Sequence, residues 1–333
     1  MQTYTADELV NIKREPLLDY VDHYDFVISG ALRGYERVGR GIALNGNNPD
    51  FPKDAAMVAT QQRAWDALNH LCIAYSAGNP LDELKDFYPT VLEYWEIYAK
   101  YDRLFDDSPE AGGRRVPHLD LYDFDYWQAL RLVCFGLLLG HSKLIPRWAP
   151  ILDYENEDPD ILIETLLAPF VQGRAAGVVY TRNLPYKKLQ KVLDAQPEKR
   201  PALMSKYLDE WYTASRREQY YEEHDSPGFT GYWSYEAAAI TWLLEIDDSS
   251  YRDKFFYPAE LVDYARAQYS MPQAAEQLQT GRAAANTACP HTGWWWTPAQ
   301  HASRREFAQG ETMPNFPNSS YGATIWYWDI NQA

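Results

Sequence analysis

The chain has 333 residues, of which 46% are hydrophobic and 15% aromatic, so its composition is that of a folded globular protein and excludes intrinsic disorder. Its formal net charge of −16 argues against direct binding of nucleic acid, because phosphates repel such a surface. The charge suits a basic protein partner, although many proteins are acidic for solubility alone.

The three cysteines, Cys72, Cys134 and Cys289, lie far apart and are odd in number, which argues against a disulfide framework and suits a reducing cytosol. The first fifteen residues are polar and acidic and lack the basic-then-apolar pattern of a leader. The longest apolar run, Leu130–Leu139, is interrupted by Arg131 and is too short to span a bilayer. We therefore expect a cytoplasmic protein that makes no membrane contact.

Residues 1–112 are expected to form an N-terminal helical domain. Apolar residues recur at helical spacing in three stretches, residues 5–40, 54–76 and 81–105. Pro89 is expected to kink or divide the third helix, because proline lacks the N–H that a helix interior needs. The segment 108–117 combines prolines, paired glycines and charges, which makes it the best candidate for a domain boundary.

Residues 113–270 are expected to form a second helical domain. Its helices resume near Leu121 and continue in four further stretches, residues 144–152, 160–171, 186–195 and 201–221. The helix that begins near Leu121 is apolar on nearly all sides, so we place it at the centre of this domain. Successive helix pairs indicate stacked hairpins, and the predicted fold class is all-α.

The stretch 231–264 reads as an apolar helix, an acidic elbow and a second helix. Trp233 lies on the apolar face of the first helix, and Glu236 borders that face, where an unpaired carboxylate would be costly to bury. Pro258 stands where a first-turn proline opens a helix. We predict structural roles for Trp233, Glu236 and Pro258.

Residues 271–333 form a third part with a different character. Glycine and proline recur too often there for long helices, and residues 294–296 and 323–328 are candidates for short strands. Because many exposed tryptophans would promote aggregation, we expect this irregular, partly β tail to pack on the helical body.

Residues 231–266, GYWSYEAAAITWLLEIDDSSYRDKFFYPAELVDYAR, resemble the core of the C-terminal domain of PoNi-type immunity proteins. Weaker resemblance covers residues 126–152 and 203–221, and the tail is similar to the ends of related toxin-immunity chains. PoNi proteins are bacterial proteins that neutralise a polymorphic toxin, often one delivered by a type VI secretion system.

The resemblance implies a protein that binds a cognate toxin effector and silences it by occluding the toxin's active site. It implies no catalysis and no cofactor. It also implies a nuclease as the toxin, with other activities open because immunity families serve toxins of different kinds. A homodimer remains open as well.

Acidic residues are the candidates for contact with a basic toxin. Residues 202–270 hold thirteen acidic residues against six basic ones, a net charge of −7. Five of these acids flank the first helix of the family-like core: Glu222, Glu223, Asp225, Asp247 and Asp248. If the two loops lie near each other, they form an acidic patch that suits the cationic phosphate-binding site of a nuclease. The alternative is a solvated acidic face without a partner.

The run Trp294-Trp295-Trp296 adds one aromatic candidate. Three consecutive side chains cannot all face one core, so at least one is expected to meet a loop, a second subunit or a partner. We include Trp295 among the predicted toxin-binding residues.

Two other classes of protein remain as alternatives. The first is a hydrolase that uses Glu236 or Asp247 as an acid or base, although acids at a helix end more often cap it. The second is a helical scaffold protein of stacked helix pairs, which would self-assemble.

No metal site is predicted. The run HLDLYDFD, with His118, Asp120, Asp123 and Asp125, matches no known order of ligands. Cys289, His291 and His301 lack a fourth ligand for a closed zinc site.

Overall fold

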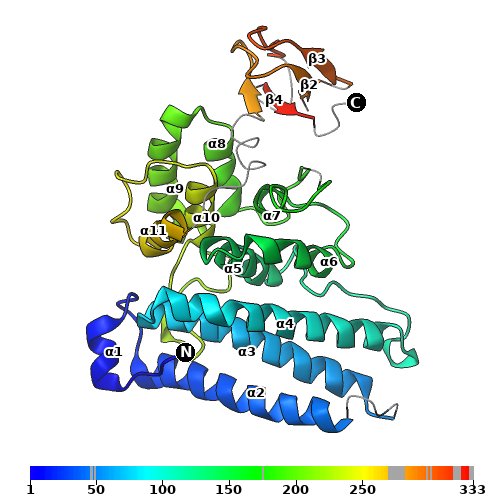
Figure 1. Cartoon of the computed structure of the whole chain (residues 1–333), viewed down its shortest axis with the longest axis vertical. Coiled ribbons are helices and arrows are strands. Elements are labelled where there is room, and N and C mark those ends of the chain that lie inside the picture. The colour runs from blue at the N-terminus through cyan, green and yellow to red at the C-terminus, as the bar shows by residue number, and fades with distance from the viewer. Residues whose placement is uncertain are drawn as a thin grey trace.

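The computed structural model describes residues 1–45, 48, 50–174, 176–268, 282–297, 299–300, 302–317 and 324–329. Within these residues the protein consists mainly of helices, with one small antiparallel sheet near the end of the chain. The predicted all-α class with a short β element in the tail is confirmed. The helices form successive layers, and the sheet lies at one end of the molecule (Figure 1).

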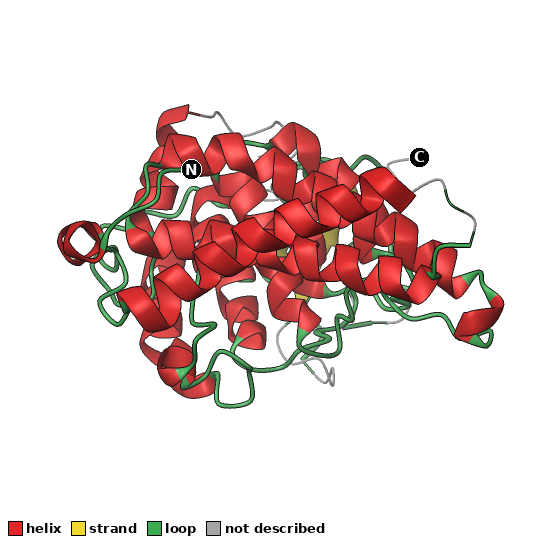
Figure 2. Cartoon of the chain, turned by 90° about the horizontal axis from the view of Figure 1, so that it is seen from below, coloured by secondary structure: helices red, strands yellow, loops and turns green. Residues whose placement is uncertain are grey.

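The N-terminal layer is built from long helices. Its elements are α1 (Ala6–Ile12), the π-helix η1 (Tyr20–Asp25), α2 (Phe26–Asn45), α3 (Lys53–Ala77) and α4 (Leu81–Asp106). A capping box starts α1, where the Thr5 hydroxyl accepts the Glu8 N–H and the Glu8 carboxylate accepts the Thr5 N–H. Helix α3 ends at Gly78, whose φ of 94° suits a residue without Cβ. Helix α3 packs against both α2 and α4. Seen from below, long helices cover this face and the strands lie behind them (Figure 2).

Helix α4 runs through Pro89 without being divided. The turn before the proline is fixed by the core, because the Tyr88 hydroxyl donates to the Leu132 carbonyl at 2.7 Å and accepts the Trp148 indole N–H at 2.7 Å. Tyr88 and Leu92, on either side of the proline, are fully buried. Tertiary packing therefore compensates for the N–H that Pro89 lacks.

The second group of helices is shorter. It comprises η2 (Pro109–Ala111), α5 (Asp125–Leu138), η3 (Ser142–Arg147), α6 (Ala149–Leu152), α7 (Ile161–Leu167), η4 (Tyr186–Leu189), α8 (Gln190–Leu193), η5 (Pro197–Lys199), α9 (Arg200–Ala214), η6 (Glu223–Asp225), α10 (Tyr235–Leu243) and α11 (Ala259–Gln268), where η2 to η6 are 3₁₀ helices. Nearly every side chain of α5 is buried, and α5 packs against α3, α7, α10 and α11. The central position predicted for this helix is confirmed.

The tail strands are β1 (Arg282–Ala284), β2 (Gly293–Trp296), β3 (Arg305–Phe307) and β4 (Ile325–Trp328). They pair antiparallel in the order β1-β4-β2-β3, with Trp295 opposite Trp328. Residues 269–281, and Ala323 of the predicted strand 323–328, lie outside the residues that the structure describes.

Among the described residues, the buried apolar side chains form two separate clusters. One extends from Leu9 to Ala265 and joins the helices on both sides of the predicted boundary at residue 112. The other contains only tail residues, centred on Trp295 and Trp326. The predicted division at residues 112 and 270 stays a prediction. In the described part of the chain, no helix is both long enough and apolar enough to cross a bilayer.

Candidate interaction surface

Glu236, in the first turn of α10, joins that helix to α9. Its Oε1 accepts hydrogen bonds from the Tyr207 hydroxyl at 2.7 Å, the Trp211 indole N–H at 2.7 Å and the Ser234 hydroxyl at 2.8 Å. Tyr207 and Trp211 are four residues apart on α9, so both point from one face of that helix. The Glu236 side chain is buried, and burial raises the pKa of its carboxyl group. The three donors satisfy this buried oxygen without a cation.

The segment before α10 also packs on the N-terminal layer. The Trp233 indole donates to the Ser76 hydroxyl at 2.8 Å and meets the Tyr75 ring edge-on at 5.1 Å. Gly231 has φ of 107°, and a Cβ there would lie 2.3 Å from the Ser76 oxygen. Only glycine fits this close approach. Pro258 is buried immediately before α11.

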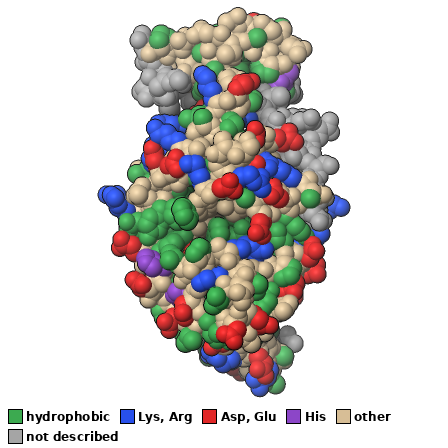
Figure 3. All heavy atoms as spheres, turned by 90° about the vertical axis from the view of Figure 1, so that its left-hand side faces the viewer, with side chains coloured by type: hydrophobic (Ala, Val, Ile, Leu, Met, Phe, Trp, Pro, Cys, Tyr) green, Lys and Arg blue, Asp and Glu red, His purple; other side chains and the backbone are tan. Residues whose placement is uncertain are grey.

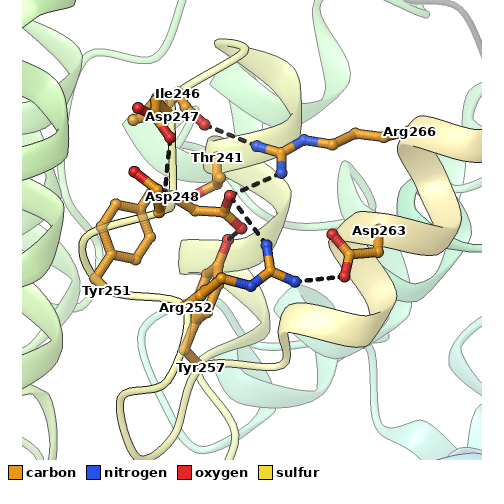
Figure 4. Close-up of polar contacts among 10 residues, drawn as sticks. Thr241, Ile246, Asp247, Asp248, Tyr251, Arg252, Tyr257, Asp263 and Arg266 are labelled. Carbon is orange, nitrogen blue, oxygen red and sulfur yellow. Dashed lines mark hydrogen bonds and ion pairs between the residues drawn. The ribbon is translucent and has the colours of Figure 1, made fainter.

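The elbow after α10 holds a buried carboxylate, Asp248, that is 3% exposed (Figure 4). It accepts from Arg266 Nη1 at 2.8 Å and from the Tyr257 hydroxyl at 3.0 Å, and Arg252 Nη1 lies 3.5 Å away. Arg266 also donates to the Ile246 carbonyl at 2.7 Å. Asp248 therefore links the elbow to α11 and does not present its charge to a partner.

Asp247, its neighbour, is exposed. Its carboxylate accepts the N–H of Ser249 at 3.0 Å, which is the geometry of an acid that stabilises a turn. That backbone hydrogen bond lowers the pKa of Asp247. Of the two adjacent acids, only Asp247 remains available at the surface.

The other predicted acids lie around η6. Glu222 and Asp225 are exposed, and Glu223 is half-buried. Glu222 has φ of 61°, in the left-handed region that residues with a side chain rarely adopt. Its N–H donates to the Tyr212 hydroxyl at 3.3 Å. His224 packs inward, with its Nδ1 2.8 Å from the Tyr232 hydroxyl.

Along the chain the two acidic loops stand on either side of α10, with residues 226–234 between η6 and the helix. The Glu222–Asp225 segment contacts Tyr212 and Tyr232. Because Asp248 is buried, it drops out of the patch predicted from the five acids, and the proximity of the two acidic loops stays a prediction.

Next to this segment, an aromatic cluster consists of Tyr212, Tyr221, Phe255 and Phe256. The Tyr212 ring lies 4.8 Å from that of Tyr221 and stacks on Phe256 at 5.4 Å, and Phe256 lies 6.3 Å from Phe255. Phe255 is 80% exposed. Figure 3 shows hydrophobic side chains gathered on one side of the helical body, with acidic side chains and a histidine at their edge. The sequence prediction did not include these four residues.

Trp295 is fully buried in the tail cluster, where its ring meets Trp328 edge-on at 5.2 Å. Its neighbours on β2 point to the other face and are half-buried. Arg304 lies over the ring of Trp294 at 4.3 Å, and Trp296 stacks on Tyr327 at 5.3 Å. Trp294 and Trp296, rather than Trp295, are the members of the run that reach the surface.

Two family models match the sequence. A model described as the N-terminal part of PoNe immunity protein (PoNi) matches residues 52–147, and one described as the C-terminal part of PoNe immunity proteins matches residues 158–261. Together they span more than half of the chain. The chain belongs to the PoNi family of immunity proteins. The predicted family resemblance is therefore confirmed.

One similar solved structure supports the fold of this PoNi chain. It is titled "The Crystal Structure of Protein PA2201 from Pseudomonas aeruginosa", and it is similar over 79% of this chain and 95% of its own, with a TM-score of 0.61 and 23% identity. At that identity the likeness concerns the fold alone. No curated protein matches the sequence significantly.

The remaining candidate residues of the PoNi chain have structural contacts. His118 is buried, with its Nδ1 2.6 Å from the Asp102 carboxylate, and it stacks on Tyr154 at 4.0 Å. The Cys289 thiol donates to the His291 carbonyl at 3.2 Å. His301 lies outside the described residues. Among the described residues, no three histidine, cysteine or acidic side chains are grouped to hold a metal ion.

The acids of the HLDLYDFD run stabilise the start of α5. Asp120 accepts the Tyr122 N–H at 2.8 Å, and Asp125 accepts the Asp120 N–H at 3.2 Å. Burial raises the pKa of Asp125 to about 6. These contacts fit turn and cap positions, which is the ordinary role of acids before a helix.

Proposed function

We propose that this PoNi protein binds a cognate antibacterial toxin effector and silences it by covering the toxin's active site. Membership of the PoNi family, established over residues 52–147 and 158–261, is the observation that supports this function. The family descriptions name an immunity function, and direct occlusion is the simplest mechanism that needs no chemistry from the immunity protein.

The charge of the chain favours a basic toxin, such as a nuclease. A nuclease presents cations where it holds phosphate, and an acidic protein is attracted to that face. The net charge of −16 suits this role, and Glu222, Asp225 and Asp247 carry exposed carboxylates in the C-terminal half. We further propose that the toxin is delivered by a type VI secretion system and that protection takes place in the cytoplasm.

The geometry at the two candidate catalytic acids favours protection without catalysis. Glu236 is 3% exposed and its Oε1 already accepts three hydrogen bonds, so a substrate cannot reach it without rearrangement of α9 and α10. Asp247 is exposed but holds the turn through the Ser249 N–H, and this hydrogen bond lowers the pKa of its carboxyl group, away from the range useful to a general acid.

The test is protection of a bacterium that expresses the toxin encoded beside the gene for this chain. Cells that produce the wild-type chain should grow, and cells with an empty vector should die. Glu236→Gln and Asp247→Asn should protect as well as wild type. Loss of protection in either variant, with folding and toxin binding unchanged, would favour the hydrolase instead. Failure of the wild-type chain to protect would overturn the proposed function.

A further inference from the structure

The aromatic cluster of Tyr212, Tyr221, Phe255 and Phe256 combines exposure with rigid support. Tyr212 is held between Tyr221 and Phe256, and its ring also meets Tyr232 at 5.0 Å. Below them, Phe256 packs on the buried ring of Trp211 at 5.2 Å. The cluster is therefore a pre-ordered aromatic platform, which loses little conformational entropy when a partner binds.

The backbone at this platform is strained in a way that exposes one ring. Phe256 has φ of 71°, an unusual value for a bulky residue, and its carbonyl accepts the Ser234 N–H at 2.7 Å. With Phe256 turned inward, Phe255 points outward and is 80% exposed. Strained backbone that displays an apolar side chain costs stability, and it is common where a protein binds a partner.

Three exposed acids adjoin platform residues in the sequence, and we take them as the rim of the platform. Glu222 directly follows Tyr221 and is exposed, as is Asp225 three residues later. Asp253, also exposed, stands two residues before Phe255. The cation between Asp253 and Phe255, Lys254, is paired with Asp209 and so adds little positive charge to the rim. An apolar centre with a polar, charged rim is the usual anatomy of a protein interface.

We propose that this platform is the centre of the toxin-binding surface, and that its occupant is a basic toxin domain that places an apolar pocket over Phe255 with lysine or arginine side chains around it. The inference rests on the proposed function and adds the face that binds. Aromatic side chains near the centre of an interface commonly dominate affinity, whereas charges at the rim mainly set the association rate.

Phe255→Ala is the central test because the side chain is so exposed that its loss should leave the fold intact. Binding to the purified toxin domain encoded beside the gene should weaken about 30-fold or more, the loss expected on truncating a central aromatic anchor. The increase in Kd should come mainly from a faster dissociation rate. Phe124→Ala, at a phenylalanine that is 51% exposed at the start of α5, is the matched control and should change Kd by less than about twofold.

Charge reversal tests the rim separately. The double variant Glu222→Lys, Asp225→Lys should lower the association rate about tenfold at low salt, with a smaller effect at high salt. Asp86→Lys on α4, an exposed acid outside the rim, is the control and should have little effect on that rate.

The outcomes separate this inference from the proposed function. If wild type neither binds nor protects, the proposed function fails. If wild type binds and protects while Phe255→Ala binds within about twofold of wild type, the platform is not the toxin-binding centre. If Phe255→Ala instead changes a dimer into a monomer and leaves toxin binding unaltered, the platform is an interface between copies and the inference is overturned.

Discussion

Removal of the Glu236 carboxylate should be among the most destabilising single changes in the C-terminal helices. In Glu236→Ala, the Tyr207 hydroxyl, the Trp211 indole N–H and the Ser234 hydroxyl all lose their shared acceptor in a buried site. A buried donor without a partner costs about 1–3 kcal/mol. Because the three losses overlap, we expect a decrease in the free energy of unfolding of about 4 kcal/mol in total.

Glu236→Gln is the matched control. Its amide oxygen keeps an acceptor at the position of Oε1, so the loss should be only about 1 kcal/mol. The measurement is urea unfolding at pH 7, followed by far-ultraviolet circular dichroism and by tryptophan fluorescence. Equal destabilisation by alanine and glutamine, or a loss below about 1 kcal/mol for alanine, would refute the assigned role of the three hydrogen bonds.

A comparison of wild type with Glu236→Gln also gives a prediction for the pH dependence of stability. Burial raises the pKa of Glu236 in the folded state above its ordinary value of about 4.5, so the folded state favours the protonated carboxyl. This contribution to stability is fully present below the unfolded pKa and is lost as pH rises through the folded pKa. The free energy of unfolding of Glu236→Gln should therefore depend less steeply on pH above 4.5 than that of wild type. Identical pH dependence would contradict the raised pKa.

Four further substitutions test the fold. Arg266→Ala removes the closest cation from buried Asp248 and should lower the free energy of unfolding in urea by about 3 kcal/mol, whereas Arg252→Ala, at the longer contact, should lower it by less than about 1 kcal/mol. Equal losses of unfolding free energy in the two arginine variants would contradict the assignment of Arg266 as the main partner of Asp248. Gly231→Ala places a methyl group 2.3 Å from a serine hydroxyl at a positive φ, and a thermal midpoint within 2 °C of wild type would refute the predicted destabilisation of about 2 kcal/mol or more. Trp295→Ala should make the tail sensitive to protease while the helical body, whose core cluster is separate, stays resistant; parallel loss of both would show that the cores are coupled.

Elements with strong local signals were predictable from the sequence. Helix α3 was expected at residues 54–76 and extends over Lys53–Ala77, because its apolar periodicity is long and Gly78 provides a left-handed end. Strand β2 was expected from its three tryptophans. Pro89 does not divide α4, and the contacts of Tyr88 that stabilise the helix there come from residues 44 and 60 positions away. The kink predicted as the other outcome stays a prediction.

Helix α9 shows a second limit. The pattern predicted a helix from residue 201 to 221, but α9 ends at Ala214. Ser215 donates through its hydroxyl to the Trp211 carbonyl at 2.7 Å, and the chain turns back so that Tyr220 stacks on Trp211 at 5.2 Å. This turn follows from packing between side chains and leaves only a weak mark in the local sequence.

The candidate surface was only partly predictable. The acidic composition indicated Glu222 and Asp248 equally as candidates. In the structure Glu222 is exposed, whereas Asp248 is buried against Arg266, eighteen residues along the chain. Strand alternation indicates that Trp295 and its neighbours face opposite sides, but which side is covered depends on distant Trp326. The exposure of Phe255 depends on the positive φ of Phe256, which no local pattern reveals.

The most direct test of the central claim is calorimetric titration of the toxin domain encoded beside the gene with the purified chain, at low and at moderate salt. We predict binding in the nanomolar range, about −12 kcal/mol, that weakens as salt rises. Tight binding that is indifferent to salt would retain the immunity role and contradict the acidic rim. Absence of binding to the products of neighbouring genes would contradict the proposed function itself.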